Sequence, residues 1–458
     1  MRCDAPYFDK FFGMHCYTTG CDGVVGSLKE KPEDWIVEEI LPNGYVIDHN
    51  APTLPHSGYE GLWTHFILIK KNIGNYEAIY YLSQLLKVPI SHFSWAGNKD
   101  KIGITLQRVS VWNVPPENLL NLKLPENIRI ISPIRELRRV HIGELQGNRF
   151  TIVIRNTNAA EFKKRVDEFN SIGCTLNYFG YQRFGVTRPL THIVGKLLIM
   201  KKYKDAFFLY LCSPSPVEKP RTLEAKLLIL EEKYEEALKI LPKKSFLFEI
   251  LMIKEFLKRK DFMRCWKVLP AWLLNIVAES YQSYLWNLTL SMICLKGIAD
   301  PLEQKLKIPL IGHNTKLGDD EISRVIKEIL EDEQISIGMF RNKKFPPLTI
   351  RGTSRVATLP TRVELMNMTK DTVTIRFSLK PGGFATVVLR EFFKQNMLDA
   401  MMSKLINRVG RENTYNRIKI CLETAKNILK ADVIDAIYKG LCMMKKQIEH
   451  ELGQMKQT

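Results

Sequence analysis

No uninterrupted apolar run in this 458-residue sequence approaches the roughly 18–20 residues that a membrane-spanning helix needs. The first residues, MRCDAPYFDKFF, have neither the apolar core nor the cleavage site of a secretory signal peptide. We therefore expect a soluble, cytoplasmic protein without a membrane partner.

Clusters of metal-binding or disulfide-forming residues are also missing from the sequence. The nine cysteines are scattered and form no C-x-x-C pair. Cysteines spaced in this way in an intracellular chain are expected to be free thiols. The histidines form no H-E-x-x-H pattern, so the sequence predicts no metal site.

Glycine-rich phosphate loops are absent as well. No G-x-G-x-x-G or G-x-x-x-x-G-K-[ST] stretch opens a helix after a strand. We therefore expect no nucleotide cofactor, and no cofactor of any other kind. The same absence disfavours an RNA methyltransferase.

Positive charge is the unusual feature that is present. The chain carries a formal net charge of +18, although its hydrophobic fraction of 45% and charged fraction of 25% are ordinary. Such an excess indicates an acidic partner, and nucleic acid is the commonest one. An anionic membrane surface is the alternative. Lys201, Lys202 and Lys204 are examples of lysines that together suit a wall contacting phosphates.

Hydrophobic patterning predicts strands and helices in the first part of the chain. Alternating stretches predict strands near residues 35–39, 63–71, 103–114 and 147–156. Helical spacing predicts a helix over 75–88, with Asn75 as a possible cap, and another over 159–172 that ends at Gly173. These elements predict an α+β domain with a mainly antiparallel sheet.

The patterning changes twice further along the chain. Successive amphipathic helices are predicted between residues 190 and 296, and strand patterning returns near residue 360. We therefore expect a sheet domain at 1–177 and 359–394, interrupted by a mostly helical insertion at 178–358. Residues 395–458 are expected to form a helical extension that packs or oligomerises, or that clamps RNA.

Five short stretches carry most of the functional signal. The turn AGNKDKIGITLQ, at residues 96–107, places Asp100 between two lysines at the start of a strand, and alone it would suit a solvated turn. It is accompanied by SLKEKPEDWIVEEI (27–40), GNRFTI (147–152), NYFGYQRFG (177–185) and PGGFATVVLRE (381–391). Together, in this order, these stretches resemble the TruD family of tRNA pseudouridine synthases over roughly residues 20–394.

The resemblance implies an isomerase that converts a uridine of tRNA, expected at position 13 in the D arm, to pseudouridine. The reaction breaks the N1–C1′ bond, turns the uracil over and rejoins it through C5. An ionised carboxylate must lie beside the ribose, and the resemblance gives this role to Asp100, as nucleophile or as base. Lys29 matches the family's basic partner, which would favour the charged carboxylate.

The fold is expected to present a flipped uracil to aromatic and polar side chains. Phe150 is the candidate for stacking on the base, and Asn148, on the same strand face, is the candidate for reading its edge. The resemblance also places Trp35 and Phe384 near the substrate. Packing is the alternative role for the three aromatic residues, and a turn is the alternative for Asn148.

Several charged residues near these motifs are given other roles. Arg183 lies in a stretch that suits a hinge where the insertion departs, and it could contact phosphate. Lys99 and Lys101 are expected to point away from Asp100, towards phosphates. Glu38 and Glu39 are expected to be structural.

A non-catalytic RNA-binding or RNA-chaperone protein remains the second hypothesis, because a basic surface would serve both. The intact Asp100 and Lys29 motifs disfavour it. The sequence leaves open whether tRNA position 13 is the only target and whether the extension mediates self-association.

Overall fold

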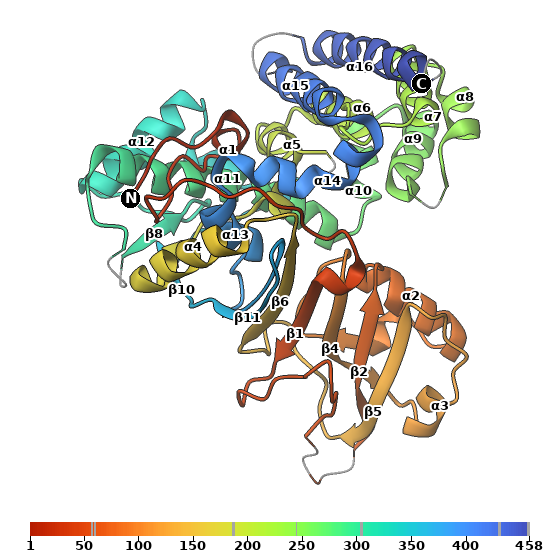
Figure 1. Ribbon diagram of the computed structural model, residues 1–458. Coiled ribbons are helices and arrows are strands. Elements are labelled where there is room, and N and C mark those ends of the chain that lie inside the picture. Colours follow the sequence, from red (N-terminus) through yellow and green to blue (C-terminus); the bar gives the residue numbers. More distant parts are fainter. Residues whose placement is uncertain are drawn as a thin grey trace. The chain divides into compact units, whose positions relative to one another are not determined.

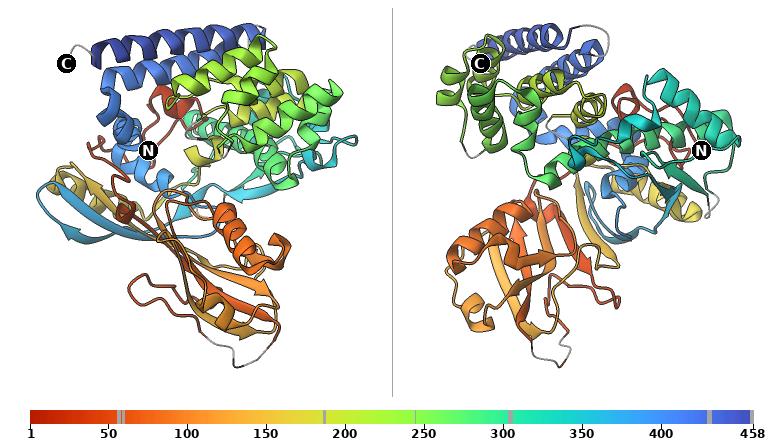
Figure 2. Two further views of the ribbon diagram at one scale, coloured as in Figure 1. Left: turned by 90° about the vertical axis from the view of Figure 1, so that its right-hand side faces the viewer. Right: turned by 180° about the vertical axis from the view of Figure 1, so that it is seen from behind.

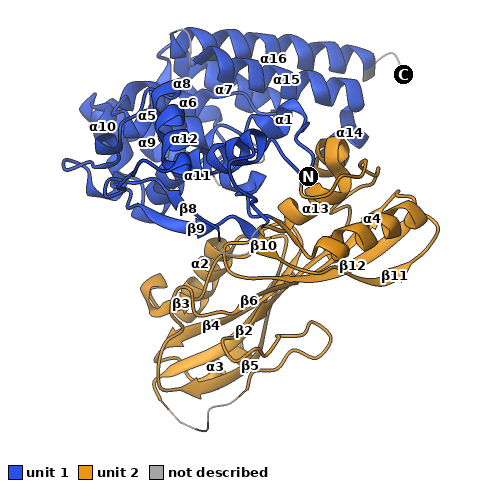
Figure 3. Ribbon diagram, turned by 90° about the vertical axis from the view of Figure 1, so that its left-hand side faces the viewer, with its two compact units in different colours: residues 1–17, 176–358, 404–458 blue, residues 18–175, 359–403 orange. Residues whose placement is uncertain are grey.

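The computed structural model (Figure 1 and Figure 2) describes residues 1–55, 58, 61–185, 188–243, 245–302, 306–428 and 432–455. The chain forms two compact units, coloured separately in Figure 3. Unit 1 comprises residues 1–17, 176–358 and 404–458, and unit 2 comprises residues 18–175 and 359–403. Among the described helices, none combines the length and apolar character that crossing a bilayer requires.

Unit 2 is built on an eight-stranded sheet (Figure 1) with the order β11-β12-β6-β1-β4-β2-β5, while β3 pairs with β4. Strands β1 and β4 are parallel, and the other pairs are antiparallel. The strands are β1 (Trp35–Ile40), β2 (Trp63–Lys71), β3 (Phe93–Trp95), β4 (Ile104–Trp112), β5 (Ile128–Glu136), β6 (Gly147–Arg155), β11 (Glu364–Met368) and β12 (Thr372–Leu379). The predicted α+β class with a mainly antiparallel sheet is confirmed.

Helices cover parts of this sheet. They are α2 (Asn75–Leu86), α3 (Pro116–Leu120), α4 (Ala159–Ile172) and α13 (Ala385–Phe393), with short 3-10 turns η1 (Pro32–Asp34), η2 (Ile90–His92) and η6 (Lys394–Asn396). Asn158 caps α4 by accepting from the Glu161 backbone N–H. Gly173 ends α4 with a φ of 74°, as the sequence predicts.

Apolar side chains bury both faces of the part of the sheet formed by β2 and β4. On one face, Phe66, Leu68 and Val109 pack against Ile79 and Leu82 of α2. Since strand side chains alternate between the two faces, the intervening residues form a second cluster, which includes Ile67 and Leu106. The face that carries α2 is also the face of the candidate site.

Unit 1 is mostly helical. Its α-helices are α1 (Tyr7–Lys10), α5 (Thr191–Ile199), α6 (Tyr203–Cys212), α7 (Pro220–Leu230), α8 (Tyr234–Ile240), α9 (Leu247–Arg259), α10 (Phe262–Lys267), α11 (Ala271–Lys296), α12 (Glu321–Asp332), α15 (Arg411–Ile428) and α16 (Val433–Met455). It also contains the strand pair β8 (Lys307–Leu310) and β9 (Thr353–Val356), and the turns η3 (Tyr181–Phe184), η4 (Ile337–Phe340) and η5 (Pro346–Leu348). Strands β7 (Cys174–Leu176) and β10 (Thr358–Pro360) and helix α14 (Met397–Val409) span the boundaries between units.

The C-terminal extension is part of the core of unit 1. Helices α15 and α16 lie side by side (Figure 2), and residues such as Cys421 and Ile437 are fully buried in the core cluster that also contains α5, α6 and α7. Arg417 of α15 donates to Glu451 of α16 at 2.8 Å and to the backbone oxygens of Pro216 and Glu218, both at 3.2 Å. Helices α15 and α16 of the extension therefore pack in the core of unit 1, and packing is one of the alternatives predicted for the extension.

The first 17 residues also belong to unit 1. The buried Asp9 accepts hydrogen bonds from the hydroxyls of Tyr17, at 3.1 Å, and Tyr181, at 2.5 Å. Cys3 and Cys16 form a disulfide. The expectation of free cysteines is therefore wrong for this pair, because a β-bridge between Arg2 and Tyr17 brings the two together across 13 residues of sequence.

Candidate active site

Asp100 lies in the turn between β3 and β4 and remains accessible. Its side chain is 28% exposed. The Trp35 indole N–H donates to Asp100 Oδ2 at 2.6 Å, and Lys29 Nζ lies 3.8 Å from the same oxygen. The structure therefore brings these three sequence-predicted residues together as a carboxylate with one donor and one cation.

Lys29 is held in a fixed position beside this carboxylate. Its φ of 57° is in the left-handed region, which a lysine adopts only at a cost in energy. Its ammonium lies 3.8 Å from the centroid of the Trp35 ring, within cation–π distance. The indole thus contacts both charged groups of the site.

A buried lysine supports the backbone of the Asp100 turn. Lys70 Nζ donates to the backbone oxygens of Asp100, at 2.5 Å, and Ile73, at 3.0 Å. Burial lowers the pKa of Lys70 to about 8, although the nearby Asp100 charge opposes this shift. None of the sequence motifs points to Lys70. Its signal is its position on the buried face of β2, in alternation with Phe66 and Leu68.

Asn75 supports the turn from α2. Its Oδ1 accepts from the Lys99 backbone N–H at 3.3 Å, and its Nδ2 donates to Gln107 Oε1 at 2.8 Å and to the Gly97 oxygen at 3.4 Å. The suggested helix-capping role is wrong, because Gly74 is the N-cap of α2 and Asn75 is its first residue. Asn75 instead joins the helix to the Asp100 turn.

The two lysines that flank Asp100 have different environments. Lys99 is buried and forms an ion pair with buried Glu39 at 2.8 Å, so the expectation that it points towards phosphate is wrong. The buried Glu39 carboxylate needs a partner of opposite charge, and Lys99 supplies it. Lys101 is 66% exposed and lies 3.4 Å from Glu77.

Strand register places aromatic residues beside the Asp100 group. Phe150 of β6 lies opposite Val37 of β1 and opposite Phe377 of β12. Its ring stacks on Phe377 with centroids 5.5 Å apart and meets the Trp35 ring edge-on at 6.4 Å. Phe150 is 7% exposed and Trp35 is fully buried, so of these two residues only Phe150 keeps any exposure.

Asn148 occupies the same face of β6, one step closer to the strand's start. It lies opposite Glu39 of β1 and Leu379 of β12. Its Oδ1 is buried and has no hydrogen-bond partner among the described residues. Since an unpaired buried polar atom is costly, this oxygen is suited to accept from a substrate N–H.

The two remaining predicted residues belong to other elements. Phe384 follows the turn after β12 and is the N-cap residue of α13, half-buried in unit 2. Arg183 belongs to unit 1, where it donates to Glu279 at 2.7 Å and to Ser283 at 3.1 Å. These bonds suit the structural role that the sequence suggested for this stretch.

The opposite face of β1 carries an ion-pair network. Glu38 accepts from Arg149 at 2.6 Å and lies 2.7 Å from His49 Nδ1, and Arg149 also donates to Asp48 at 2.7 Å. Burial would raise the pKa of Glu38, but the Arg149 and His49 hydrogen bonds lower it. Glu38, Asp48 and His49 form the one group with metal-ligand side chains found among the described residues, and the Arg149 guanidinium already pairs with both of its carboxylates.

Comparison with known proteins identifies relatives across most of the chain. A family model described as tRNA pseudouridine synthase D (TruD) matches residues 11–307 and 300–392. The protein named "Probable tRNA pseudouridine synthase D 1" of Methanocaldococcus jannaschii is 32% identical over 384 residues, which cover 81% of this chain and 96% of that protein. The "Probable tRNA pseudouridine synthase D" of Methanopyrus kandleri is 34% identical over 360 residues, covering 75% of this chain and 89% of that one.

A solved structure agrees with this assignment. The crystal structure of a TruD protein from Methanosarcina mazei superposes with a TM-score of 0.65 at 27% identity, covering 86% of this chain and 99% of that one. The family model ends at residue 392, so α15 and α16 lie beyond it. The chain belongs to the TruD family of tRNA pseudouridine synthases.

Proposed function

We propose that this chain isomerises a uridine of tRNA to pseudouridine, with Asp100 as the carboxylate that acts on the ribose. Family membership supports the activity, and the proposed target is position 13 in the D arm. The observation that carries the assignment is the accessible Asp100 carboxylate, held by the Trp35 indole and by Lys29. Asp100 is either the nucleophile or the base in this scheme.

Each neighbouring group then has a defined task. The Lys29 ammonium lies 3.8 Å from Asp100 Oδ2 and places a positive charge beside the carboxylate. The Trp35 N–H orients one carboxylate oxygen of Asp100. This role replaces stacking on the substrate base, because the Trp35 ring is fully buried. Lys70 and Asn75 fix the backbone around Asp100, so little reorganisation is needed when the ribose arrives.

The flipped uracil is proposed to meet Phe150 and Asn148. Stacking on an aromatic ring contributes about 1–3 kcal/mol per base, which offsets part of the cost of flipping. The unpartnered Oδ1 of Asn148 is the acceptor for the uracil N3–H group. Phe384, at the start of α13, is proposed to contact the substrate. Arg183 is proposed to have a structural role in unit 1.

We assign the chemistry to the sheet domain, which was predicted at 1–177 and 359–394 and whose sheet belongs to unit 2, residues 18–175 and 359–403. RNA grip is assigned to the insertion at 178–358. Lys201, Lys202, Lys204 and Lys260 line one shallow depression of unit 1, which supports phosphate contacts there. Self-association through 395–458 stays a prediction, as do the cytoplasmic location and the absence of a cofactor.

Release of tritium from tRNA labelled at uracil C5 tests the catalytic assignment. Asp100→Asn is expected to abolish release because the neutral amide can act neither as nucleophile nor as base, while tRNA affinity stays within about two-fold. Asp167→Asn on α4 is the matched control, since Asp167 is exposed and pairs only with Lys163 among the described residues. Turnover by Asp100→Asn near the native rate would defeat the assignment. Unmodified RNA after incubation with the native chain would favour the RNA-binding alternative.

A further inference from the structure

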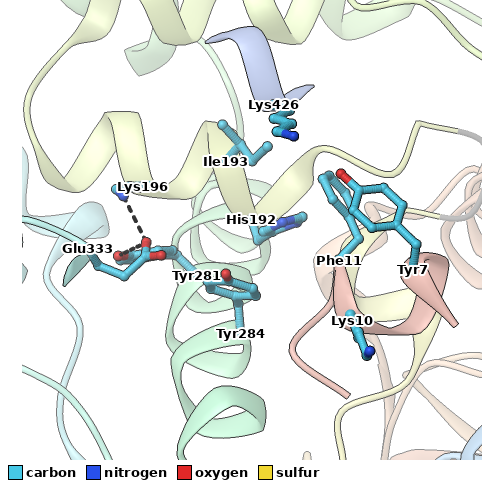
Figure 4. Close-up of a pocket in the computed structure, with 10 residues that line it drawn as sticks. All are labelled: Tyr7, Lys10, Phe11, His192, Ile193, Lys196, Tyr281, Tyr284, Glu333 and Lys426. Atoms are coloured by element: carbon cyan, nitrogen blue, oxygen red, sulfur yellow. Dashed lines mark hydrogen bonds and ion pairs between the residues drawn. The ribbon is translucent and has the colours of Figure 1, made fainter. Parts of the chain in front are cut away.

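A cavity of about 200 Å³ lies inside unit 1, remote in sequence from the Asp100 motifs. Figure 4 shows its walls, which come from α1, α5, α11 and α15 and from Glu333 just after α12. One of these helices, α15, lies beyond the part of the chain that the family model matches. The cavity therefore combines the N-terminal segment and the helical insertion with the extension of this chain.

Aromatic rings make the cavity suitable for a flat ring. Phe11 meets His192 edge-on with centroids 5.2 Å apart, and Tyr284 lies against the other side of His192 at 5.0 Å. Tyr7 and Tyr281 also line the cavity (Figure 4). An apolar cavity of about 150 Å³ is large enough to bind benzene, so this one has room for a single aromatic ring system.

His192 offers an unused hydrogen-bonding group in this wall. The residue is 4% exposed, and its Nδ1 is buried with no hydrogen-bond partner among the described residues. Burial lowers the pKa of His192 to about 3, so the imidazole is neutral at physiological pH and can donate at one nitrogen and accept at the other. A neutral ring with an unpartnered Nδ1 favours a ligand with its own ring donors and acceptors.

The charged residues of the cavity leave a net positive charge at its rim. Lys196 is neutralised by Glu333 at 2.8 Å, and Glu333 also accepts from the Tyr281 hydroxyl at 2.9 Å. Lys10 and Lys426 are exposed and form no ion pair with any residue in the described part of the chain. Two unpaired ammonium groups beside an aromatic slot indicate an aromatic ligand that carries negative charge.

The wall formed by α1 is held by several buried contacts. Asp9, next to Lys10, is anchored by the Tyr17 and Tyr181 hydroxyls, and Phe12 stacks on Phe184 at 5.1 Å. The disulfide between Cys3 and Cys16 closes the segment that contains α1. A preformed wall lowers the entropy that a ligand must lose on binding.

We propose that this cavity binds a nucleoside monophosphate unit, with its base in the aromatic slot beside His192 and its phosphate at Lys426. The unit is either a free nucleotide or one nucleotide of a bound RNA, since both offer the same base and phosphate. Lys10 adds to the positive field from α1. The proposal does not depend on catalysis at Asp100.

Calorimetric titration of the full chain with adenosine 5′-monophosphate tests the proposal. Saturable binding is expected, and Lys426→Glu should weaken it about ten-fold or more, because repulsion replaces a charge-assisted contact. Lys419→Glu is the matched control: it lies on the same helix, is 72% exposed and makes the same change of charge. Its effect should stay within about two-fold.

Two further probes and one competition complete the test. Ribose 5-phosphate and adenosine should both bind more weakly, because each lacks one half of the unit. If tRNA displaces the Lys426-sensitive nucleotide, the natural occupant is an RNA nucleotide, and if it does not, the occupant is a free one. Absence of binding, equal weakening by both lysine variants, or equal affinity for ribose 5-phosphate would each overturn the proposal. Tritium release by the native chain reports on Asp100 separately.

Discussion

The indole of Trp35 is the residue-scale feature that joins the parts of the candidate active site. It donates to Asp100, lies under the Lys29 ammonium and meets Phe150 edge-on. Glycine is required next to it, because a Cβ at Gly103, whose φ is 125°, would lie 2.4 Å from the Trp35 backbone oxygen. Strand β4 can therefore start directly against the indole.

Trp35→Phe keeps an aromatic ring but removes the N–H donor to Asp100. We expect kcat to fall about 10–100-fold, because a hydrogen bond to a charged group contributes about 1.5–3 kcal/mol. The KM for tRNA should change little, since the fully buried ring makes no surface for RNA. Trp112→Phe, in the same sheet, is the control and should stay within about two-fold of native activity. An equal loss of kcat in both variants would contradict the specific role of Trp35.

At the scale of single elements, one buried carboxylate fixes helix α13 to neighbouring segments of unit 2. Glu391 accepts from the backbone N–H groups of Thr18 and Thr19 at 2.9 and 3.1 Å and from Thr175 Oγ1 at 3.2 Å. Lys394 Nζ lies 3.2 Å away, also buried. The helix that follows Phe384 is thereby fixed by an ion pair rather than by packing alone.

Removal of this carboxylate tests the attachment. Glu391→Gln should lower the free energy of unfolding of unit 2 by about 3–5 kcal/mol, because Lys394 stays buried without its counter-charge. Chemical denaturation measures the loss, with exposed Glu364→Gln as the control. Adding Lys394→Met to Glu391→Gln should restore part of the stability. A loss no larger than that of the control would refute the argument.

The same pair makes stability depend on pH in a defined direction. Burial would raise the pKa of Glu391, but Lys394 and the Thr18 and Thr19 N–H groups lower it below its ordinary value. A carboxyl with a lowered pKa in the folded state stabilises the fold above its unfolded pKa, and this contribution is lost as the pH falls through the folded value. The acid-induced loss of stability should therefore be smaller in Glu391→Gln than in the native chain.

At the scale of the whole molecule, the last two helices of the chain complete the hydrophobic core of unit 1. Residues of α15 and α16 are buried among those of α5 to α7, and the buried Arg417–Glu451 pair binds α15 to α16. Arg417 also bonds the Pro216 and Glu218 oxygens, so the extension is tied to the segment before α7. The extension is thus a structural part of this unit.

A chain ending after Ser403 should expose the apolar side chains that α15 and α16 cover. We expect increased binding of a hydrophobic dye and a lower thermal unfolding midpoint, because a large apolar surface loses its partner. Lys419→Glu, which leaves the buried faces intact, should match the native chain in both measurements. Unchanged dye binding in the shortened chain would contradict this account.

The sequence by itself determined the local elements and the chemistry-bearing motifs. Alternation predicts β1 and β6, the Gly173 stop predicts the end of α4, and the ordered motifs point to Asp100, Lys29, Phe150 and Asn148. These features are local. They depend on the two-residue period of strands, on the left-handed conformation that glycine permits, and on short motifs that can be compared directly with those of a family.

Tertiary structure alone decided which side chains meet. Lys70 and Asn75 reach the Asp100 turn from β2 and α2, Lys99 turns inward to Glu39, and Lys426 joins Phe11 at one cavity. Nothing in the spacing of these residues indicates such contacts, because sheet register and helix packing bring together positions that are distant in sequence. The burial that creates those contacts also converts residues typical of a solvated surface into parts of a site.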